Sequence, residues 1–155
     1  MTSATGAYDA LRARLTAGIT AGIITIPLRY PGEDNGPLPD TPADFGYVVF
    51  DNMGSRPGPV AFGGGNGRNL YRNLAALTVF VFVPNRSGVR RATVEADAIA
   101  DWMRSFRNAD IFCRSADASP VGDGASIAPP GLQRNELNNY LCAVVEVDVS
   151  FDTIG

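Results

Sequence analysis

The segment Leu141-Cys142-Ala143-Val144-Val145-Glu146-Val147-Asp148-Val149-Ser150-Phe151-Asp152 decides the fold. Side chains in a β-strand point alternately to the two faces of the sheet. Every second residue from Leu141 to Phe151 is apolar, whereas the intervening positions include Glu146, Asp148 and Asp152. This alternation predicts a strand over Tyr140–Phe151 with one buried face and one face in water, which is typical of an antiparallel sheet.

Two further segments predict the body of this sheet. Gly46–Asp51 is a short β-rich run, and Leu70–Val83 is the longest one in the chain. The second half of Leu70–Val83 is apolar at nearly every position, so we expect a central strand covered on both sides, at least one of them by a helix. Pro59–Phe62 and Ile111–Arg114 predict two weaker strands.

Two amphipathic helices are expected to pack on the sheet. The first covers residues 6–18, with Leu11 and Leu15 on its apolar side and Thr5 as its cap. The second covers residues 91–107, with acids toward its start and Arg104 and Arg107 at its end, as the helix dipole favours. Its apolar stripe consists of Ala92, Ala96, Ile99, Met103 and Phe106, with Trp102 alongside.

The connections have distinct compositions. Ile23–Tyr30 is β-rich, but Pro27 restricts it to a sheet edge or ends it early. Residues 31–45 hold four prolines and predict an extended, exposed arm, whereas residues 115–136 are loop-like. The sequence thus predicts an α+β fold with a mostly antiparallel sheet, an N-terminal helix and one central helix, in a single domain spanning residues 1–155.

Composition argues against catalysis. The chain has no His and no Lys, and its 13 basic residues are all Arg. A Ser-His-Asp triad, a Schiff-base lysine and a Walker A lysine are therefore excluded. Cys113 and Cys142 cannot supply a four-ligand zinc site, and we expect both to be free, buried thiols. We predict no enzyme activity, no cofactor, and no catalytic or metal-binding residue.

Three candidate sites have simpler interpretations. The glycine-rich segment Gly63, Gly64, Gly65, Asn66, Gly67, Arg68, Asn69 joins two strands and lacks a phosphate-loop pattern, so it predicts a hairpin tip. The acids of the last strand could hold a metal, but a solvent-facing strand explains them more simply. Arginines around Tyr71 could touch nucleic acid, although the net charge of −3 makes sequence-specific binding unfavourable. These are Arg68, Arg72, Arg86, Arg90 and Arg91.

Charge is segregated along the chain. Residues 56–107 carry eight Arg and three acids, whereas residues 108–155 carry two Arg and seven acids. Opposite charges on different faces suit subunits that stack or form rings. No apolar run reaches the length of a membrane helix, and the N-terminus shows no signal-peptide pattern, so we expect a soluble protein made in the cytoplasm.

One ordered pattern resembles a known family. A long apolar strand ends in Val81-Phe82-Val83-Pro84, and a short loop with Gly88 then leads to the helix carrying Ala96-Asp97. A leucine-containing first helix, Ile26-Pro27 and a proline-rich acidic arm precede it, and an alternating strand follows. The pattern covers about residues 6–152 and resembles the tail-terminator (tail-completion) proteins of long-tailed phages and gene transfer agents. The loop after Pro84 is longer and more polar than is usual in that family.

The resemblance implies a structural virion protein and not an enzyme. Such proteins form hexameric rings that cap the tail tube, end its polymerisation and present the surface for the head–tail connector. The implied partners are other copies of the chain, the tail-tube protein and a neck protein, with DNA passing through the ring without specific binding. The implied location is the tail or neck of a virion, after assembly in the host cytoplasm.

Two features are expected to serve this assembly. The arm and the hairpin Gly63–Asn69 would bridge neighbouring subunits. The acids Glu146, Asp148 and Asp152 would face the channel, because an acidic lining repels the DNA duplex and lets it slide. The alternatives are another neck or minor tail protein, or a soluble module that binds a small ligand in a pocket under residues 115–136.

Overall fold

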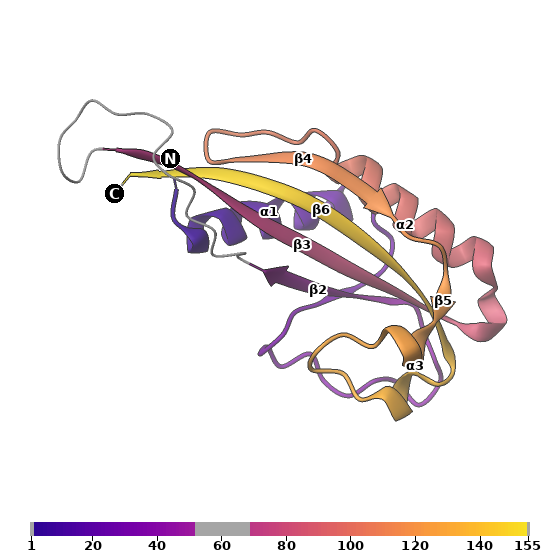
Figure 1. Ribbon diagram of the computed structural model, residues 1–155. Helices are drawn as coiled ribbons and strands as arrows, with labels where there is room; N and C mark the ends of the chain where they lie inside the picture. Colours follow the sequence, from indigo (N-terminus) through magenta and orange to yellow (C-terminus); the bar gives the residue numbers. More distant parts are fainter. Residues whose placement is uncertain (1, 52–68, 155) are drawn as a thin grey trace.

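The computed structural model describes residues 2–51 and 69–154, which form a sheet of six strands with the two long helices on one side. Figure 1 shows their arrangement. The strand order is β1-β2-β3-β6-β4, and β5 pairs with β6 outside this path. Only β1 and β2 are parallel, so the predicted α+β fold with a mostly antiparallel sheet is confirmed. The strands are β1 (Leu28–Arg29), β2 (Phe45–Asp51), β3 (Leu70–Pro84), β4 (Ile111–Ala118), β5 (Gly122–Asp123) and β6 (Tyr140–Ile154).

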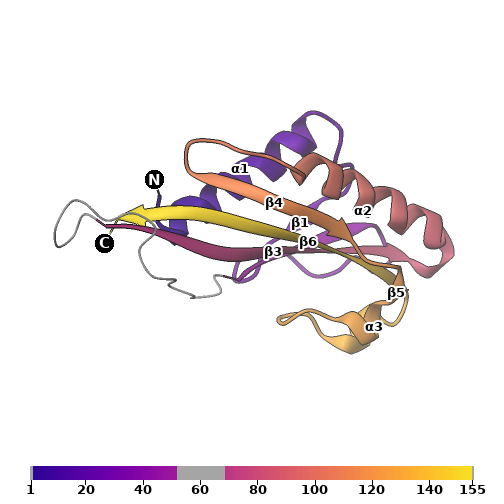
Figure 2. The same cartoon turned by 45° about the horizontal axis from the view of Figure 1, so that its top comes forward.

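The helices divide the molecule into layers. Helices α1 (Ala4–Thr20) and α2 (Val89–Met103) lie on one face of the sheet, and the short α3 (Gly124–Ile127) lies beyond the other face at one end (Figure 2). Two 3₁₀ turns cover Asn85–Ser87 and Arg134–Leu137. We call the side of the sheet under α1 and α2 the helix-covered face and the other side the open face.

The main core lies between the helix-covered face and the two helices. Strand β6 contributes Val145, Val147 and Val149, each at most 1% exposed. The register places Val145 beside Val79 of β3, so apolar side chains from neighbouring strands form continuous rows. Leu11 and Leu15 of α1 and Ile99 of α2 are fully buried against these rows, as the helical periodicity predicts. Apolar burial of this kind is the main source of stability in a fold of this size.

A second, smaller cluster covers one end of the open face. Phe45 of β2 stacks on Phe82 of β3 with ring centroids 4.9 Å apart, and Tyr140 meets both rings edge-on. Leu137 from the second 3₁₀ turn closes the cluster from outside the sheet. The prediction that the second half of β3 is covered on both sides is confirmed at Phe82, with α2 on one side and residues 127–137 on the other, whereas Thr78 and Phe80 on the open face are only half-buried.

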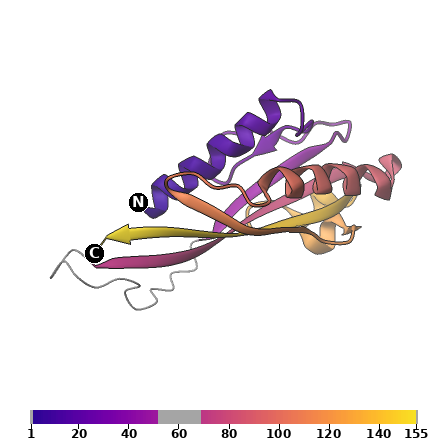
Figure 3. The same ribbon diagram turned by 90° about the horizontal axis from the view of Figure 1, so that it is seen from above.

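Arg14 and Trp102 lock the two long helices together. The Arg14 guanidinium lies 3.4 Å from the centroid of the indole ring and donates to the Trp102 carbonyl oxygen, while the indole N–H donates to the Arg14 carbonyl. Figure 3 shows α1 and α2 on the same side of the sheet. Gly18 permits this approach, because a Cβ at this position would lie 2.8 Å from both Trp102 and Ile24. Burial lowers the pKa of Arg14.

The central helix differs from the prediction at both ends. It covers Val89–Met103 and not residues 91–107. Ser105 has a positive φ of 58°, which reverses the chain so that the carbonyl of Phe106 accepts a hydrogen bond from the N–H of Cys113. The expected match to the helix dipole is also wrong, since the first turn holds no acid and the last turn holds no base. Arg90 and Arg91 lie in the first turn instead.

Smaller corrections concern the connections. Residues 115–136 are not simply a loop, because β4 continues to Ala118 and β5 and α3 follow. Ser3, and not Thr5, caps α1, and Gly22, with a φ of 71°, follows the end of that helix. Only Leu28–Arg29 of the β-rich run is a strand, and it lies at the sheet edge, as Pro27 predicts.

The predicted arm is a loop held against the body. Residues 31–44 contain no helix or strand and are mostly exposed, whereas Phe45 is buried in β2. The side chain of Arg12 on α1 contacts Glu33, and Arg29 donates to the carbonyl oxygens of Gly36 and Pro37. Because of these contacts, the arm is more restricted than the extended, exposed segment that we predicted.

Candidate assembly surface

The part of the open face that residues 127–137 leave uncovered is the candidate functional surface. It has two columns of side chains: β2, β3 and Val144 of β6 contribute mostly apolar groups, whereas the rest of β6 and the neighbouring β4 contribute acids. The apolar column is half-buried, although it lies on an outer face of the sheet. Contiguous apolar surface of this kind is typical of a contact with another molecule. We call this column the apolar strip: Val49, Leu74, Ala76, Phe80 and Val144.

The acids of β6 have three different environments. Glu146 is exposed and lies directly opposite the exposed Asp117 of β4 in the antiparallel register. Two like charges at such a position repel each other, and no basic group among the described residues pairs with either of them. We call Asp117 and Glu146 the acidic pair. Asp148 accepts a hydrogen bond of 2.8 Å from the hydroxyl of Ser115.

Asp152 is neutralised by a neighbouring strand. Its two carboxylate oxygens accept hydrogen bonds from Nε and Nη2 of Arg72 at 2.9 and 3.1 Å. These hydrogen bonds, more than any other cause, lower the pKa of Asp152 below its usual value. The pair joins β3 to β6 near both chain ends, where the backbone N–H of Thr2 donates to the carbonyl of Asp152.

A pocket of about 650 Å³ lies beside this ion pair. Arg72, Arg107, Arg114, Phe112 and Asp152 are among its lining residues. The Arg107 guanidinium lies 5.8 Å from the centroid of the Phe112 ring, which is 39% exposed. The lining offers guanidinium groups and the exposed Phe112 ring, so it suits polar contacts with another molecule. Within the described residues, no group of three or more Cys, Asp and Glu side chains could hold a metal ion.

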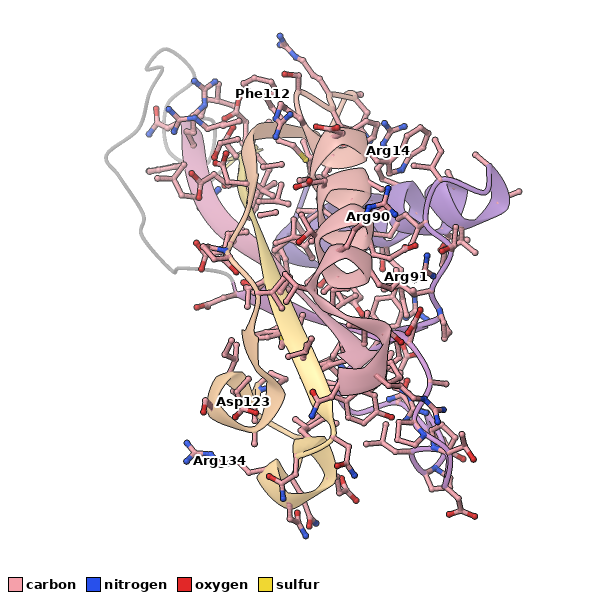
Figure 4. All side chains as sticks on the ribbon, turned by 90° about the vertical axis from the view of Figure 1, so that its right-hand side faces the viewer. Arg14, Arg90, Arg91, Phe112, Asp123 and Arg134 are labelled. Atoms are coloured by element: carbon pink, nitrogen blue, oxygen red, sulfur yellow. The ribbon has the colours of Figure 1, made fainter. Side chains whose placement is uncertain are left out.

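A basic patch lies on the opposite side of the molecule, at the N-terminal end of α2. Arg90 and Arg91 project from this end of the helix (Figure 4). Val89 and Val94 are 57% and 47% exposed. Gly88 provides no side-chain cap, so the positive end of the helix dipole lies next to basic side chains. We call Arg86, Val89, Arg90 and Val94 the helix-end patch.

Arg91 turns inward from this patch and pairs with the buried carboxylate of Glu95. Its Nε donates to Asp44 at 2.9 Å, and its Nη1 lies 2.9 Å from Oε1 of Glu95. Thr25 donates to the same Glu95 oxygen at 2.6 Å. Glu95 is only 3% exposed, and its second oxygen has no partner among the described residues. The network joins α2 to the end of the arm and to the segment after α1.

Only part of the predicted assembly surface can be located. Gly63–Arg68, and also the weak strand Pro59–Phe62, lie outside the described residues, while Asn69 directly precedes β3. The arginines considered for nucleic acid do not form one patch, because Arg72 and Arg86 lie roughly 40 Å apart along β3. Arg72 and Arg91 are moreover engaged in ion pairs.

The sequence analysis missed two features of this surface. The acidic pair depends on the register of β4 against β6, which contains a bulge between Cys113 and Ser115. No local pattern in the sequence gives that register. The Arg91–Glu95 spacing of four residues was visible as a helical ion pair, but its burial depends on Asp44 and Thr25, which are distant in sequence.

Comparisons with known proteins do not assign the chain to a family. The chain matches no protein-family model, and a search of curated proteins also finds no match. Among the described residues, no helix combines the length and apolar character needed to span a membrane.

Proposed function

We propose that this chain is a structural subunit that forms a ring at the end of a phage-type tail tube, ends tube polymerisation and offers a docking surface to a neck protein. The proposal rests on the family resemblance described for the sequence and on one structural observation. A long β3–β6 ribbon, with 15 residues in each strand, carries an uncovered face that is apolar on one side and acidic on the other. A surface of this kind suits contacts with other protein copies more than binding of a small substrate.

The proposal assigns no chemistry to the chain. Its partners are other copies, a tail-tube protein and a neck protein, and DNA passes through the ring without specific contacts. We place Asp148 and Asp152 toward the channel, at the end of the ribbon that holds both chain termini. The Asp148 carboxylate has only a neutral hydroxyl beside it, whereas Arg72 offsets the charge of Asp152. Asp148 therefore carries most of the repulsion of DNA in this proposal.

The second candidate is a module that binds a small ligand. One observation favours it, a pocket of about 430 Å³ between the arm and residues 131–136, lined by Arg29, Asp34, Tyr47 and Glu136 among others. Burial raises the pKa of the Tyr47 phenol, which therefore stays a neutral hydrogen-bonding group at pH 7. A chain of this second kind would remain monomeric and would bind no tube.

The experiment is a tube-polymerisation assay. Purified chain is added to the tail-tube protein of the same particle while tubes grow, and tube lengths and ends are recorded by negative-stain electron microscopy. The proposal predicts shorter tubes of narrow length distribution with a ring at one end. Tubes without added chain are the control. Unchanged tube lengths and bare tube ends, together with a monomeric chain in light scattering, would overturn the proposal and favour the ligand-binding module.

A further inference from the structure

Two surfaces on opposite sides of the subunit carry complementary, unbalanced charge. The acidic pair lies on the open face beside the apolar strip. The helix-end patch lies on α2, which packs on the other side of the sheet (Figure 2). Each surface is unfavourable in an isolated subunit, because Asp117 repels Glu146 and because Arg90 lies at the positive end of the α2 dipole.

Both surfaces also combine these charges with apolar side chains, which are exposed on α2 and half-buried on the sheet. Arg90 and Val94 are four residues apart and therefore lie on the same side of α2. On the sheet, Val144 and Phe80 are register partners, and the next pair along the same face is Thr78 and Glu146. An apolar contact with charges along one side is thus available on each surface, with opposite sign. Apolar centres with charged rims are the usual composition of protein–protein contacts.

We propose that the helix-end patch of one subunit docks on the apolar strip and acidic pair of the next copy, with Val94 against Phe80 and Val144 and with Arg86 and Arg90 beside Asp117 and Glu146. This inference rests on the proposed function and identifies the surface through which the ring forms. It assigns Glu146 to a subunit contact and leaves Asp148 and Asp152 for the channel.

A second copy of the chain is the occupant that the charges favour. The two surfaces differ from each other and lie on opposite sides, so the contact is head-to-tail and can repeat around a ring. A two-fold dimer would instead place like surfaces together and would leave both charge imbalances in place.

Strand-to-strand addition is a poorer route, because the edge of β4 is already occupied. Phe106 accepts from the N–H of Cys113, and Asn108 donates to the carbonyl of Ile111. The guanidinium of Arg104 donates to the carbonyl of Ala116. These contacts take up backbone groups that a strand from another subunit would need. The opposite edge of the sheet holds only the two-residue β1.

Charge reversal tests the contact by sedimentation velocity across a concentration series. Arg90→Glu and Glu146→Arg should each weaken self-association by about tenfold or more, since each places like charges together. An equimolar mixture of the two variants should associate as the wild type does. When the two variants alternate, every contact pairs opposite charges, either as in the wild type or with both signs reversed. Arg134→Glu is the matched control, as Arg134 is an exposed arginine that lies near Asp123 and away from α2 (Figure 4). It should associate normally.

Cross-linking tests the geometry of the same contact. A Val94→Cys, Val144→Cys double variant should give a ladder of covalent oligomers after mild oxidation, with the buried native cysteines unmodified. A product that stops at the dimer, or a cross-link only to the tail-tube protein, would overturn the head-to-tail contact. So would wild-type protein that stays monomeric at its highest soluble concentration, or a variant mixture that remains defective.

The tube assay separates this inference from the proposed function. If Arg90→Glu caps tubes as well as the wild type does, the contact is wrong while the ring function stands. If self-association follows the charge pattern but tubes keep growing, the contact stands while the tail-terminator function is wrong.

Discussion

The two faces of β6 come from the same strand and differ in what they do. On the helix-covered face, Ala143, Val145, Val147, Val149 and Phe151 are at most 3% exposed and meet α1, α2 and neighbouring strands. On the open face, burial falls along the strand, from the fully buried Cys142 to the exposed Glu146 and Asp148. The helix-covered face supplies the apolar burial that stabilises the fold, whereas the open face keeps Glu146 and Asp148 in solvent.

The apolar–polar alternation of β6 therefore has different consequences on its two faces. On one face it specifies packing, and each side chain has a partner within the chain. On the other face it leaves interactions incomplete, since Asp117 and Glu146 repel each other beside half-buried apolar groups. Local conflict of this kind is expected at functional surfaces, where stability of the isolated subunit is lowered for the sake of assembly.

The largest expected effect is on the helix-covered side. Ile99→Ala removes a fully buried side chain from α2 and should lower the free energy of unfolding by roughly 2–5 kcal/mol. Val94→Ala, on the exposed side of the same helix, should change it by no more than about 0.5 kcal/mol. Urea denaturation at low protein concentration measures both. Equal effects of the two substitutions would contradict the assignment of these helix sides.

A second test compares two neighbouring arginines of α2. Arg91→Ala leaves the buried carboxylate of Glu95 without its cation and should destabilise the fold by about 1–3 kcal/mol, a value reduced because Arg91 itself is partly exposed. Arg90→Ala, one residue earlier, should have little effect on the monomer. A Glu95→Gln background should reduce the cost of losing Arg91. An unchanged cost there would show that the two side chains are not coupled.

Sequence periodicity predicted the helix-covered face well. Leu11, Leu15 and Ile99 are buried where the helical spacing places them, and the alternation of β6 marks its buried residues. The end of α2 was not predictable, because the helical period continues to Phe106 and no Gly or Pro interrupts it. The reversal at Ser105 is set by the pairing of Phe106 with β4, which is a tertiary contact.

The open face was predicted less completely. Its acids were recognised, but Ser150, which the alternation places on the face in water, is only 8% exposed because β4 lies beside it. The length of β4 was underestimated, since Ser115, Ala116 and Asp117 have low β-propensity and become a strand only beside β6. Arg72 opposite Asp152 likewise required the register of β3 against β6.

The two cysteines report on the two faces of the sheet, because Cys113 lies in the main core and Cys142 in the smaller cluster. Both are free and buried, as predicted, and burial raises the pKa of Cys113 to about 11 and that of Cys142 to about 12. Few thiolates therefore exist at pH 8, and iodoacetamide should label both residues slowly until the protein opens. Cys142 lies in the smaller cluster and should react first, by about tenfold, through local opening. Mass spectrometry of partially labelled protein measures the order, and earlier labelling of Cys113 would reverse our ranking of the two cores.

The Arg72–Asp152 pair should contribute about 0.2–1 kcal/mol, because both side chains are partly exposed. The pKa of Asp152 is lowered in the folded state, so this contribution is present above the unfolded pKa and disappears as the pH falls through the folded value. Arg72→Ala should therefore be less stable than the wild type at pH 7 and equal to it at strongly acid pH. A difference that persists in acid would point to lost packing and not to the ion pair.

The smallest effect concerns the acidic pair itself. Glu146→Gln removes one of two facing like charges and should raise the free energy of unfolding of the monomer by about 0.3 kcal/mol. The same substitution should weaken self-association, which distinguishes it from an ordinary surface change. Asp123→Asn is a control for lost acidic charge, because Asp123 caps α3 away from the pair. A variant that is both less stable and better associated would contradict the comparison.

Native mass spectrometry of the purified chain, alone and in the presence of tail tubes, tests whether this subunit forms a closed ring. We expect one closed species of hexameric mass, formed by the chain itself or released from tube ends. That species should disappear in Arg90→Glu and return in the equimolar mixture with Glu146→Arg. A monomer under all of these conditions, or an open-ended series of oligomers without a closed species, would contradict the claim that this chain is a ring-forming assembly subunit.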